Sequence, residues 1–523
     1  MSSPMKYRQS GFVVAGWLLL VAVSLLGQDI KPTDGASAAS PTNIGSRLEL
    51  FVDEALIAGM RGVSLQPHRP SMAAVALSFD RPWEGGGNHY VTVFKDGPVY
   101  RMYYRCVAGS NISPTGEGWV IHTCYAESRD GIHWERPNLG LVEFGGSRQN
   151  NILSIPSNGA TDWNEESNFA AFKDLNPNAP ESERYKAVAG ESVPVDLGLY
   201  GFVSPDGIHW QRKTTQPIMT KAMTKYPMPN AFDSQNVAFW DTIQKQYVSY
   251  IRDMYPKPGT EELIRGIRRT ASADFVHWST PEWIDFGNSA SQQFYTNAIT
   301  PYFRAPHIYL GFPMRFMPNR YADFLPKVYD KLREQGVTDS LFMASRDGEH
   351  WQYYPEAFIS GGIDPLNWTD RSNCVAWGVV PTGKDEISLY VLEGYHLPSI
   401  HIRRAVLRTD GFVSVSAPYS GGELVTKPII FQGTKLVINY STSAAGSVRV
   451  EIQDIDGKPI PGFRLVDSRD LFGDLVEQEV RWDGGPEVSA VAGRPVRLRF
   501  VMKDADLYSF QFRDNGLEKS QGR

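Results

Sequence analysis

Short apolar runs separated by polar turns follow one another along most of the chain. Residues 90–94, 99–106 and 120–127, for example, are rich in β-branched and aromatic side chains and have the length of strands. Helical periodicity is nearly absent, and only residues 322–336 suggest a short helix, as an insertion in the fourth repeat described below. The pattern therefore predicts an all-β protein.

One seven-residue stretch recurs after such runs. It reads "SRDGIHW" at 128–134, "SPDGIHW" at 204–210, "SADFVHW" at 272–278 and "SRDGEHW" at 345–351, and a degenerate copy keeps only Asp410 and its glycine. Asp bonds the backbone two residues on, Gly accepts positive φ, and Trp begins the next strand and fills a gap between units. We interpret the stretch as a structural turn. Its histidines lie on separate units, so a shared metal site is not expected.

Five such units, each with room for about four strands, predict a five-bladed β-propeller. We expect the run 47–57 to close the ring against the last blade, and blade one to extend from about residue 74 to residue 146. The regular alternation after residue 420 predicts an antiparallel β-sandwich packed on the propeller. The expected domains are a propeller over 47–420, an accessory sandwich over 421–515 and a tail over 516–523.

The N-terminus has the plan of a secretory signal. Lys6 and Arg8 precede an uncharged apolar run at 11–27, so we predict a signal peptide over 1–27 and a linker over 28–46. The length of the run leaves an uncleaved membrane anchor open. The protein is thus expected to be secreted or periplasmic, with no second membrane segment.

Charge and cysteine content narrow the function classes. The net charge is −6, and no basic tract is long enough to indicate nucleic-acid binding. Of the three cysteines, Cys106 and Cys124 lie on consecutive predicted strands, where a disulfide and two buried thiols are both open. No motif indicates a metal or another cofactor, and we expect a monomer.

Chemistry is expected where the innermost strands of the blades converge. Acids near the starts of those strands are Asp80 and Glu84, Glu165 and Glu166, Asp233, Asp370, and Glu393. Glycosidic bond cleavage needs one carboxylic acid to protonate the leaving oxygen and one carboxylate to activate water or attack the sugar. The sequence therefore favours a carbohydrate substrate.

We predict that Glu84, Glu166 and Asp233 are catalytic and line one cleft, with Arg315, Trp368 and Arg371 on the opposite wall. Arginine and tryptophan there would bind hydroxyl, carboxylate or sulfate groups and the face of a sugar ring. The full set of predicted substrate-binding residues is Trp83, His89, Asn168, Asn236, Tyr295, Asn297, Arg315, Trp368, Arg371 and Glu393, and His396 is a further polar candidate.

The blade count, the central acids and the added sandwich resemble the five-bladed glycoside hydrolases of the invertase, levansucrase and arabinanase superfamily. The likeness covers about residues 47–512 and is closest to bacterial exported proteins similar to the N-terminal domain of family 32. It implies an Asp as nucleophile or base, an Asp as stabiliser and a Glu as acid, one from each of the first three blades. These map to Glu84 or Asp80, Glu166 and Asp233. A carbohydrate-binding propeller without catalysis and a protein-interaction propeller remain alternatives.

Overall fold

The computed structural model describes residues 40–108, 120–156, 168–190, 198–223, 231–257, 259–260 and 262–514. The predicted signal peptide and the acids Glu165 and Glu166 lie outside these ranges. Among the described residues, no helix is both long and apolar enough to span a membrane.

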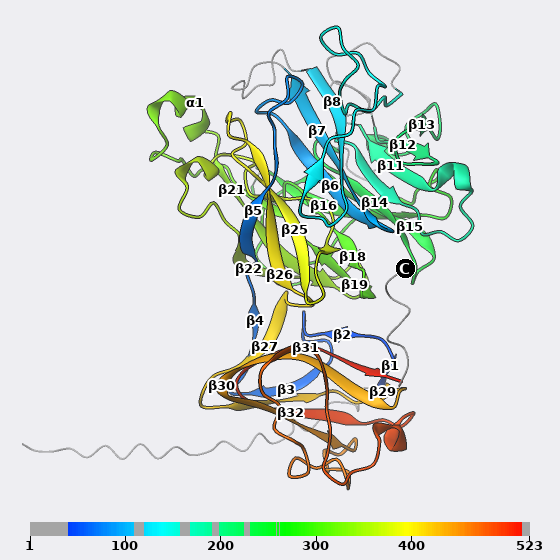
Figure 1. Cartoon of the computed structure of the whole chain (residues 1–523), viewed down its shortest axis with the longest axis vertical. Helices are drawn as coiled ribbons and strands as arrows, with labels where there is room; N and C mark the ends of the chain where they lie inside the picture. The colour runs from blue at the N-terminus through cyan, green and yellow to red at the C-terminus, as the bar shows by residue number, and fades with distance from the viewer. Residues whose placement is uncertain are drawn as a thin grey trace, which may run out of the picture. The chain divides into compact units, whose positions relative to one another are not determined.

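Five separate sheets form the propeller blades (Figure 1). Blade one contains β6 (His89–Asp96), β7 (Val99–Ala108), β8 (Val120–Ser128) and β9 (Trp134–Glu135). Blade two contains β10 (Ala170–Lys173), β11 (Tyr185–Ala189), β12 (Tyr200–Ser204) and β13 (Gln211–Arg212). Blade three contains β14 (Val237–Asp241), β15 (Gln246–Pro256), β16 (Leu263–Ser272) and β17 (Glu282–Trp283). The all-β propeller prediction is confirmed.

The last two blades each have five strands. Blade four contains β18 (Thr300–Tyr302), β19 (Ala305–Gly311), β20 (Met314–Met317), β21 (Val337–Ser345) and β22 (Gln352–Ile359). Blade five contains β23 (Cys374–Val375), β24 (Val380–Pro381), β25 (Glu386–Glu393), β26 (His401–Arg408) and β5 (Ser71–Ser78). The insertion before β21 holds only one helical turn, α1 (Asp330–Arg333), after a 3₁₀ turn at Lys327–Tyr329.

The ring is closed by β5, which pairs antiparallel with β26 although some 330 residues separate them, as Ser71 opposite Val406 shows (Figure 1). The prediction that 47–57 closes the ring is wrong, and so is the assignment of residues 74–78 to blade one. The reason is that successive side chains of residues 47–57 are buried in two different cores. Leu50 and Val52 are buried in the propeller core, whereas Phe51 is buried in the C-terminal core, so the segment lies between two apolar clusters.

The C-terminal region also contains strands from before the propeller. An eight-stranded sheet combines β2 (Glu49–Leu50), β3 (Ile57–Arg61), β4 (Ser64–Pro67), β27 (Val413–Ala417), β28 (Gly422–Thr426), β30 (Lys435–Gln453), β31 (Asp474–Glu479) and β32 (Arg497–Arg513). A two-stranded parallel sheet joins β1 (Thr42–Gly45) to β29 (Ile429–Phe431). Sheet pairing thus departs from the expected boundaries at residues 47 and 421. The sandwich form of this region stays a prediction.

The repeated turns have one geometry in four different blades. In the first, Ser128 Oγ accepts from the amides of Asp130 and Gly131, and Asp130 Oδ1 accepts from the amides of Ile132 and His133. The same bonds recur around Asp206, Asp274 and Asp347. Each tryptophan follows the third strand of a different blade, so the structural interpretation of the repeat is confirmed.

The copy without glycine shows that the turn requires a positive φ at this position. Gly207 adopts φ 81°, and Phe275, at the equivalent position, adopts φ 68° itself. A positive φ is uncommon for a residue with a side chain, and here the surrounding hydrogen bonds hold it. The fifth copy is used differently, because buried Asp410 accepts hydrogen bonds from Tyr302 of blade four and from Asn439 and Ser509 of the C-terminal sheet.

A disulfide joins Cys106 and Cys124 on neighbouring strands of blade one, with their Cα atoms 6.0 Å apart. This decides between the two alternatives that the sequence left open. Cys374 is a buried free thiol, and burial raises its pKa to about 12.

Candidate functional site

An asparagine marks the start of the innermost strand in every blade. The five are Asn88, Asn168, Asn236, Asn297 and Asn373, and all are buried. Asn236 Oδ1 accepts from the Arg252 amide at 2.9 Å, and Asn297 donates to the Tyr250 carbonyl at 3.2 Å. Both were predicted to bind substrate, but their amides bond the backbone. The repeat is visible in the sequence as "GNHYV", "SNFAA", "QNVAF", "TNAIT" and "SNCVA", although no prediction was based on it.

These asparagines surround a cluster of charged and aromatic side chains that we call the polar mouth of the propeller. Its members come from all five blades: Tyr90, Arg105, Asn168, Asp233, Arg252, Arg265, Tyr295, Asp370, Arg371, Tyr395 and His396. They are near enough to interact electrostatically, since Arg105, Asp233 and Arg371 all act on the Tyr90 phenol. Burial, and then Tyr295, raise the pKa of Tyr90 well above its usual value. The loops before β6, β14, β18 and β23 therefore converge on one place.

Asp233 is the carboxylate of the polar mouth that solvent reaches. Its side chain is 36% exposed, whereas the side chain of its partner Arg252 is 2% exposed. Arg252 Nη1 donates to Asp233 Oδ2 at 2.8 Å and also to the Asp233 carbonyl, and its guanidinium lies 4.6 Å from the centre of the Tyr295 ring. Burial alone would lower the pKa of Arg252, but Asp233 raises it. A buried charge thus fixes a carboxylate that remains open on one side.

Arg371 organises the blade-five side of the polar mouth. It adopts φ 57°, donates from Nε to Asp370 Oδ2 at 2.8 Å and lies over the Tyr395 ring at 4.6 Å. Its Nη2 is 3.0 Å from His396 Nε2. Burial, then the charges of Arg371 and Arg105, lower the pKa of His396 to about 2, so the imidazole is neutral and its Nε2 accepts this bond.

Arg105 connects three blades from the middle of β7. It donates to Asn168 Oδ1 of blade two at 3.2 Å and to the Tyr395 hydroxyl of blade five at 3.3 Å, and it lies over the Tyr90 ring at 4.6 Å. Arg105, Arg252 and Arg265 were not among the predicted site residues. Each lies within a strand that reads as core, where the only signal was a charge in an otherwise apolar run.

Of the predicted catalytic acids, the structure does not bring Glu84 to Asp233. Glu84 is buried within blade one, where the Tyr104 hydroxyl donates to it at 2.6 Å and Arg136 Nε lies 3.2 Å away. Burial raises the pKa of Glu84 despite Arg136. Trp83 beside it donates to Asn151 at 2.8 Å, and exposed Asp80 pairs with Arg136. The loop preceding β6 turns these side chains toward the outer strands of the blade.

Most of the predicted opposite wall also has other partners. Arg315 bonds Asp339, Trp368 donates to the Gly362 carbonyl, and Glu393 accepts from His401 and Arg403. None of these three has a described contact with the polar mouth. The structure does bring His89 there, because its Nε2 donates to the Arg371 carbonyl at 3.0 Å. Asn168, Tyr295 and Arg371 are likewise members, and Glu166 lies outside the described residues.

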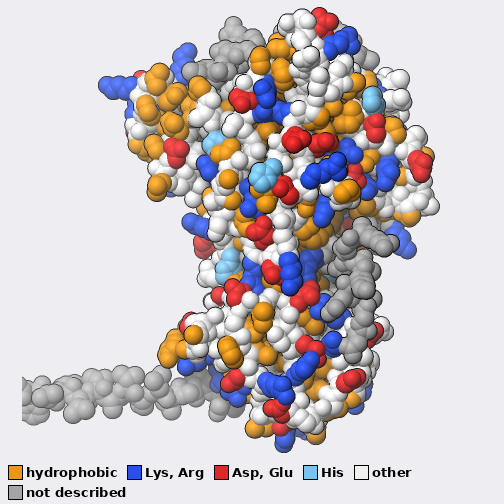
Figure 2. All heavy atoms as spheres, viewed as in Figure 1, with side chains coloured by type: hydrophobic (Ala, Val, Ile, Leu, Met, Phe, Trp, Pro, Cys, Tyr) orange, Lys and Arg blue, Asp and Glu red, His pale blue; other side chains and the backbone are white. Residues whose placement is uncertain are grey.

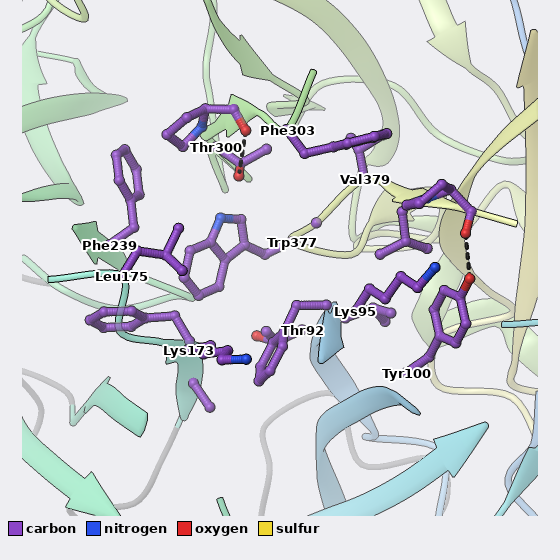
Figure 3. A pocket seen from close by; sticks show the side chains of 18 of the residues that line it. Thr92, Lys95, Tyr100, Lys173, Leu175, Phe239, Thr300, Phe303, Trp377 and Val379 are labelled. Atoms are coloured by element: carbon purple, nitrogen blue, oxygen red, sulfur yellow. Dashed lines mark hydrogen bonds between the residues drawn. The ribbon is translucent and has the colours of Figure 1, made fainter. Parts of the chain in front are cut away.

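A second opening lies at the other ends of the inner strands. It is a cavity of about 970 Å³, which we call the apolar mouth, and Figure 3 shows Trp377 in its middle with Phe239, Phe303 and Leu175 around it. Lys95 and Lys173 supply charge, and no Asp or Glu is among its described lining residues. Among the described residues, the polar mouth contains carboxylates and the apolar mouth does not.

The two mouths are separated by a layer of bonded side chains and backbone. Trp377 donates from Nε1 to the Ile299 carbonyl at 2.8 Å, and its own backbone bonds Val91 and Val93 of β6. Gln235 donates to Thr92 Oγ1 at 3.0 Å. These bonds link blades one, three, four and five.

Two further observations concern metal-binding groups and the distribution of charge on the surface. Among the described residues, no group of three or more His, Cys, Asp or Glu is placed to hold a metal ion. On the face seen in Figure 2, acidic and basic side chains are interspersed rather than gathered by sign. The clearest concentration of like charge that we find is the arginine set inside the polar mouth.

Comparisons with known proteins return only distant structures. No protein-family model matches the sequence, and no curated protein does. A solved structure described as "Glycoside hydrolase" has a TM-score of 0.47 at 14% identity, covering 65% of this chain and 92% of that one. A family 43 arabinoxylan arabinofuranohydrolase from Bacillus subtilis has 0.40 at 10%, covering 83% and 97%. The catalytic domain of a Coprinopsis cinerea GH62 α-L-arabinofuranosidase has 0.39 at 8%, covering 66% and 98%. Structural similarity at these TM-scores and identities says nothing about activity. Evidence for an activity has to come from the residues of the polar mouth.

Proposed function

We propose that this protein is an exported glycoside hydrolase that cleaves its substrate in the polar mouth. One observation carries the proposal: Asp233 keeps an exposed carboxylate at the point where all five blades meet, while buried Arg252 holds it in place. Three buried or nearly buried tyrosines around it offer ring faces and hydroxyls of the kind that bind sugars.

We assign the roles of the acidic residues from their exposure to solvent. Asp233 is open to a ligand, so it serves as the carboxylate that activates water or attacks the anomeric carbon. Asp370 is buried and bonded to Arg371, so it positions that guanidinium. The general acid is Glu166, which the sequence puts just before the first strand of blade two. It would protonate the leaving oxygen.

The test is product release by wild-type protein and by Asp233→Asn on a panel of plant, algal and bacterial glycans. We expect wild type to release reducing sugars from at least one glycan, and Asp233→Asn to lose at least about a thousandfold of that turnover. Glu84→Gln is the matched control, because Glu84 likewise precedes the first strand of a blade but has no described contact with Asp233. A fully active Asp233→Asn variant would contradict the assignment.

A carbohydrate-binding propeller without catalysis is the second candidate. It is favoured by the fact that Asp233 is the only exposed carboxylate of the polar mouth among the described residues. Binding of a glycan by wild type without any product, and with affinity lost in Tyr295→Ala, would support this alternative.

Export is tested separately. Edman sequencing of protein recovered outside the cytoplasm should begin after residue 27. An intact Met1 on membrane-bound protein would instead support the anchor.

A further inference from the structure

Arg265 brings a guanidinium to the polar mouth without an acid of its own. Its Nη1 donates to the neutral Gln293 Oε1 at 2.9 Å, and the guanidinium lies 4.9 Å from the centre of the Tyr295 ring and 4.7 Å from that of Phe316. Within the described part of the chain, its buried Nε has no hydrogen-bond partner. An arginine between two aromatic rings loses water without gaining a carboxylate.

Like charges surround Arg265. Burial, then Arg252 and Arg371, lower its pKa, while Asp233 acts in the opposite direction. Asp233 is already bonded to Arg252, and Asp370 is bonded to Arg371. Among the described residues in this part of the mouth, three guanidinium groups therefore share two carboxylates. A guanidinium fork fits the two oxygens of a carboxylate or sulfate, and such bonds are strong where water is excluded.

We propose that the sugar bound in the polar mouth carries an anionic group, a carboxylate or a sulfate ester, and that Arg265 binds this group. The inference rests on the proposed function in that it deepens the substrate class of the same site. In this proposal Arg265 selects acidic over neutral sugars, and Asp233 takes part in cleavage of the glycosidic bond.

The experiment measures binding of monosaccharides, which have no glycosidic bond to cleave, to the full-length wild-type protein by calorimetry at low salt. The probes are D-galacturonate and D-galactose 6-sulfate, each compared with neutral D-galactose. We expect one of the two anionic sugars to bind at least about tenfold more tightly than galactose, and the preference to fall with added NaCl. The arm that shows the preference distinguishes a carboxylate from a sulfate.

Arg265→Gln should remove the preference, so that the anionic sugar binds no more tightly than galactose does. Arg269→Gln is the control: it makes the same change on the same strand, four residues away, where the guanidinium bonds Glu349 and Gln244. Equal binding of all three sugars by wild type, or an unchanged preference in Arg265→Gln, would overturn the proposal. A preference that depends on Arg265 in a protein that cleaves no glycan would instead disprove the hydrolase and leave this inference standing.

Discussion

The two mouths of the propeller are built from the opposite ends of the same strands, yet their chemistry differs. At the starts of the strands, arginines, tyrosines and Asp233 interact across four blades, and Asn168 of blade two bonds Arg105. At the other ends, Trp377, Phe239 and Leu175 line a cavity without a described acid (Figure 3). Of the two mouths, the polar mouth thus contains the described carboxylates. Cavity volume measures available space, whereas catalysis needs charged groups that the fold holds in place.

We expect the largest effect on turnover from Arg252→Lys, which keeps a positive charge in the polar mouth but changes where that charge lies. Arg252→Lys keeps the cation but loses the paired bonds to Asp233 and the stacking on Tyr295, so turnover should fall about a thousandfold, about 4 kcal/mol in transition-state stabilisation. Phe303→Leu is the counterpart in the apolar mouth and should stay within about twofold of wild type. Initial rates on a cleaved glycan measure both. Similar losses in the two variants would remove the distinction between the mouths.

The layer between the mouths should matter for stability rather than for turnover. Trp377→Phe removes buried volume and leaves the Ile299 carbonyl without its donor, so the free energy of unfolding should fall by about 2–3 kcal/mol. Urea denaturation measures this change. Turnover per folded molecule should be unchanged, and a fall of more than tenfold would show that the two mouths communicate.

We predict that the stability of the protein falls at acid pH because of Asp96, at the rim of the apolar mouth. Burial would raise the pKa of Asp96, but bonds from Lys173, Tyr185 and Arg101 lower it from 3.8 to about 2. The folded-state pKa is depressed, so the stabilisation is present above pH 4 and is lost as pH falls toward 2. It amounts to about 2 kcal/mol.

Asp96→Asn should therefore lower stability at pH 7 and flatten its decline between pH 4 and pH 2. Thermal unfolding across that range measures the effect in both proteins. Parallel pH profiles for wild type and variant would show that the bonds between blades one and two at Asp96 contribute nothing.

The smallest effect is expected at Asp130 of the first repeated turn, which lines neither mouth. Asp130 is nearly half exposed, and its bonds reach only Ser128, Ile132 and His133. Asp130→Ala should change the free energy of unfolding by less than about 1 kcal/mol, with normal turnover. A larger loss, seen by denaturant midpoint, would mean that the turn also holds neighbouring blades together.

The sequence by itself determined the blades. In each repeated turn the hydrogen bonds to the aspartate side chain come from within four residues, so these bonds follow from local residue types. The five asparagines before the inner strands were equally visible and marked where the polar mouth begins. Asp233 was predicted as a site residue in the same way, from its place just before an inner strand.

Tertiary structure alone decided the partners. Arg105 and Tyr395 are 290 residues apart, and His89 and Arg371 are 282 apart, so no local pattern relates them. Glu84 and Asp233 occupy similar positions in the sequence, but a bond from Tyr104 turns one into its blade, while Arg252 holds the other at the axis. The closing strand was missed for the same reason: residues 47–57 and 71–78 both read as strands, and only packing against two apolar cores decided which one completed the ring.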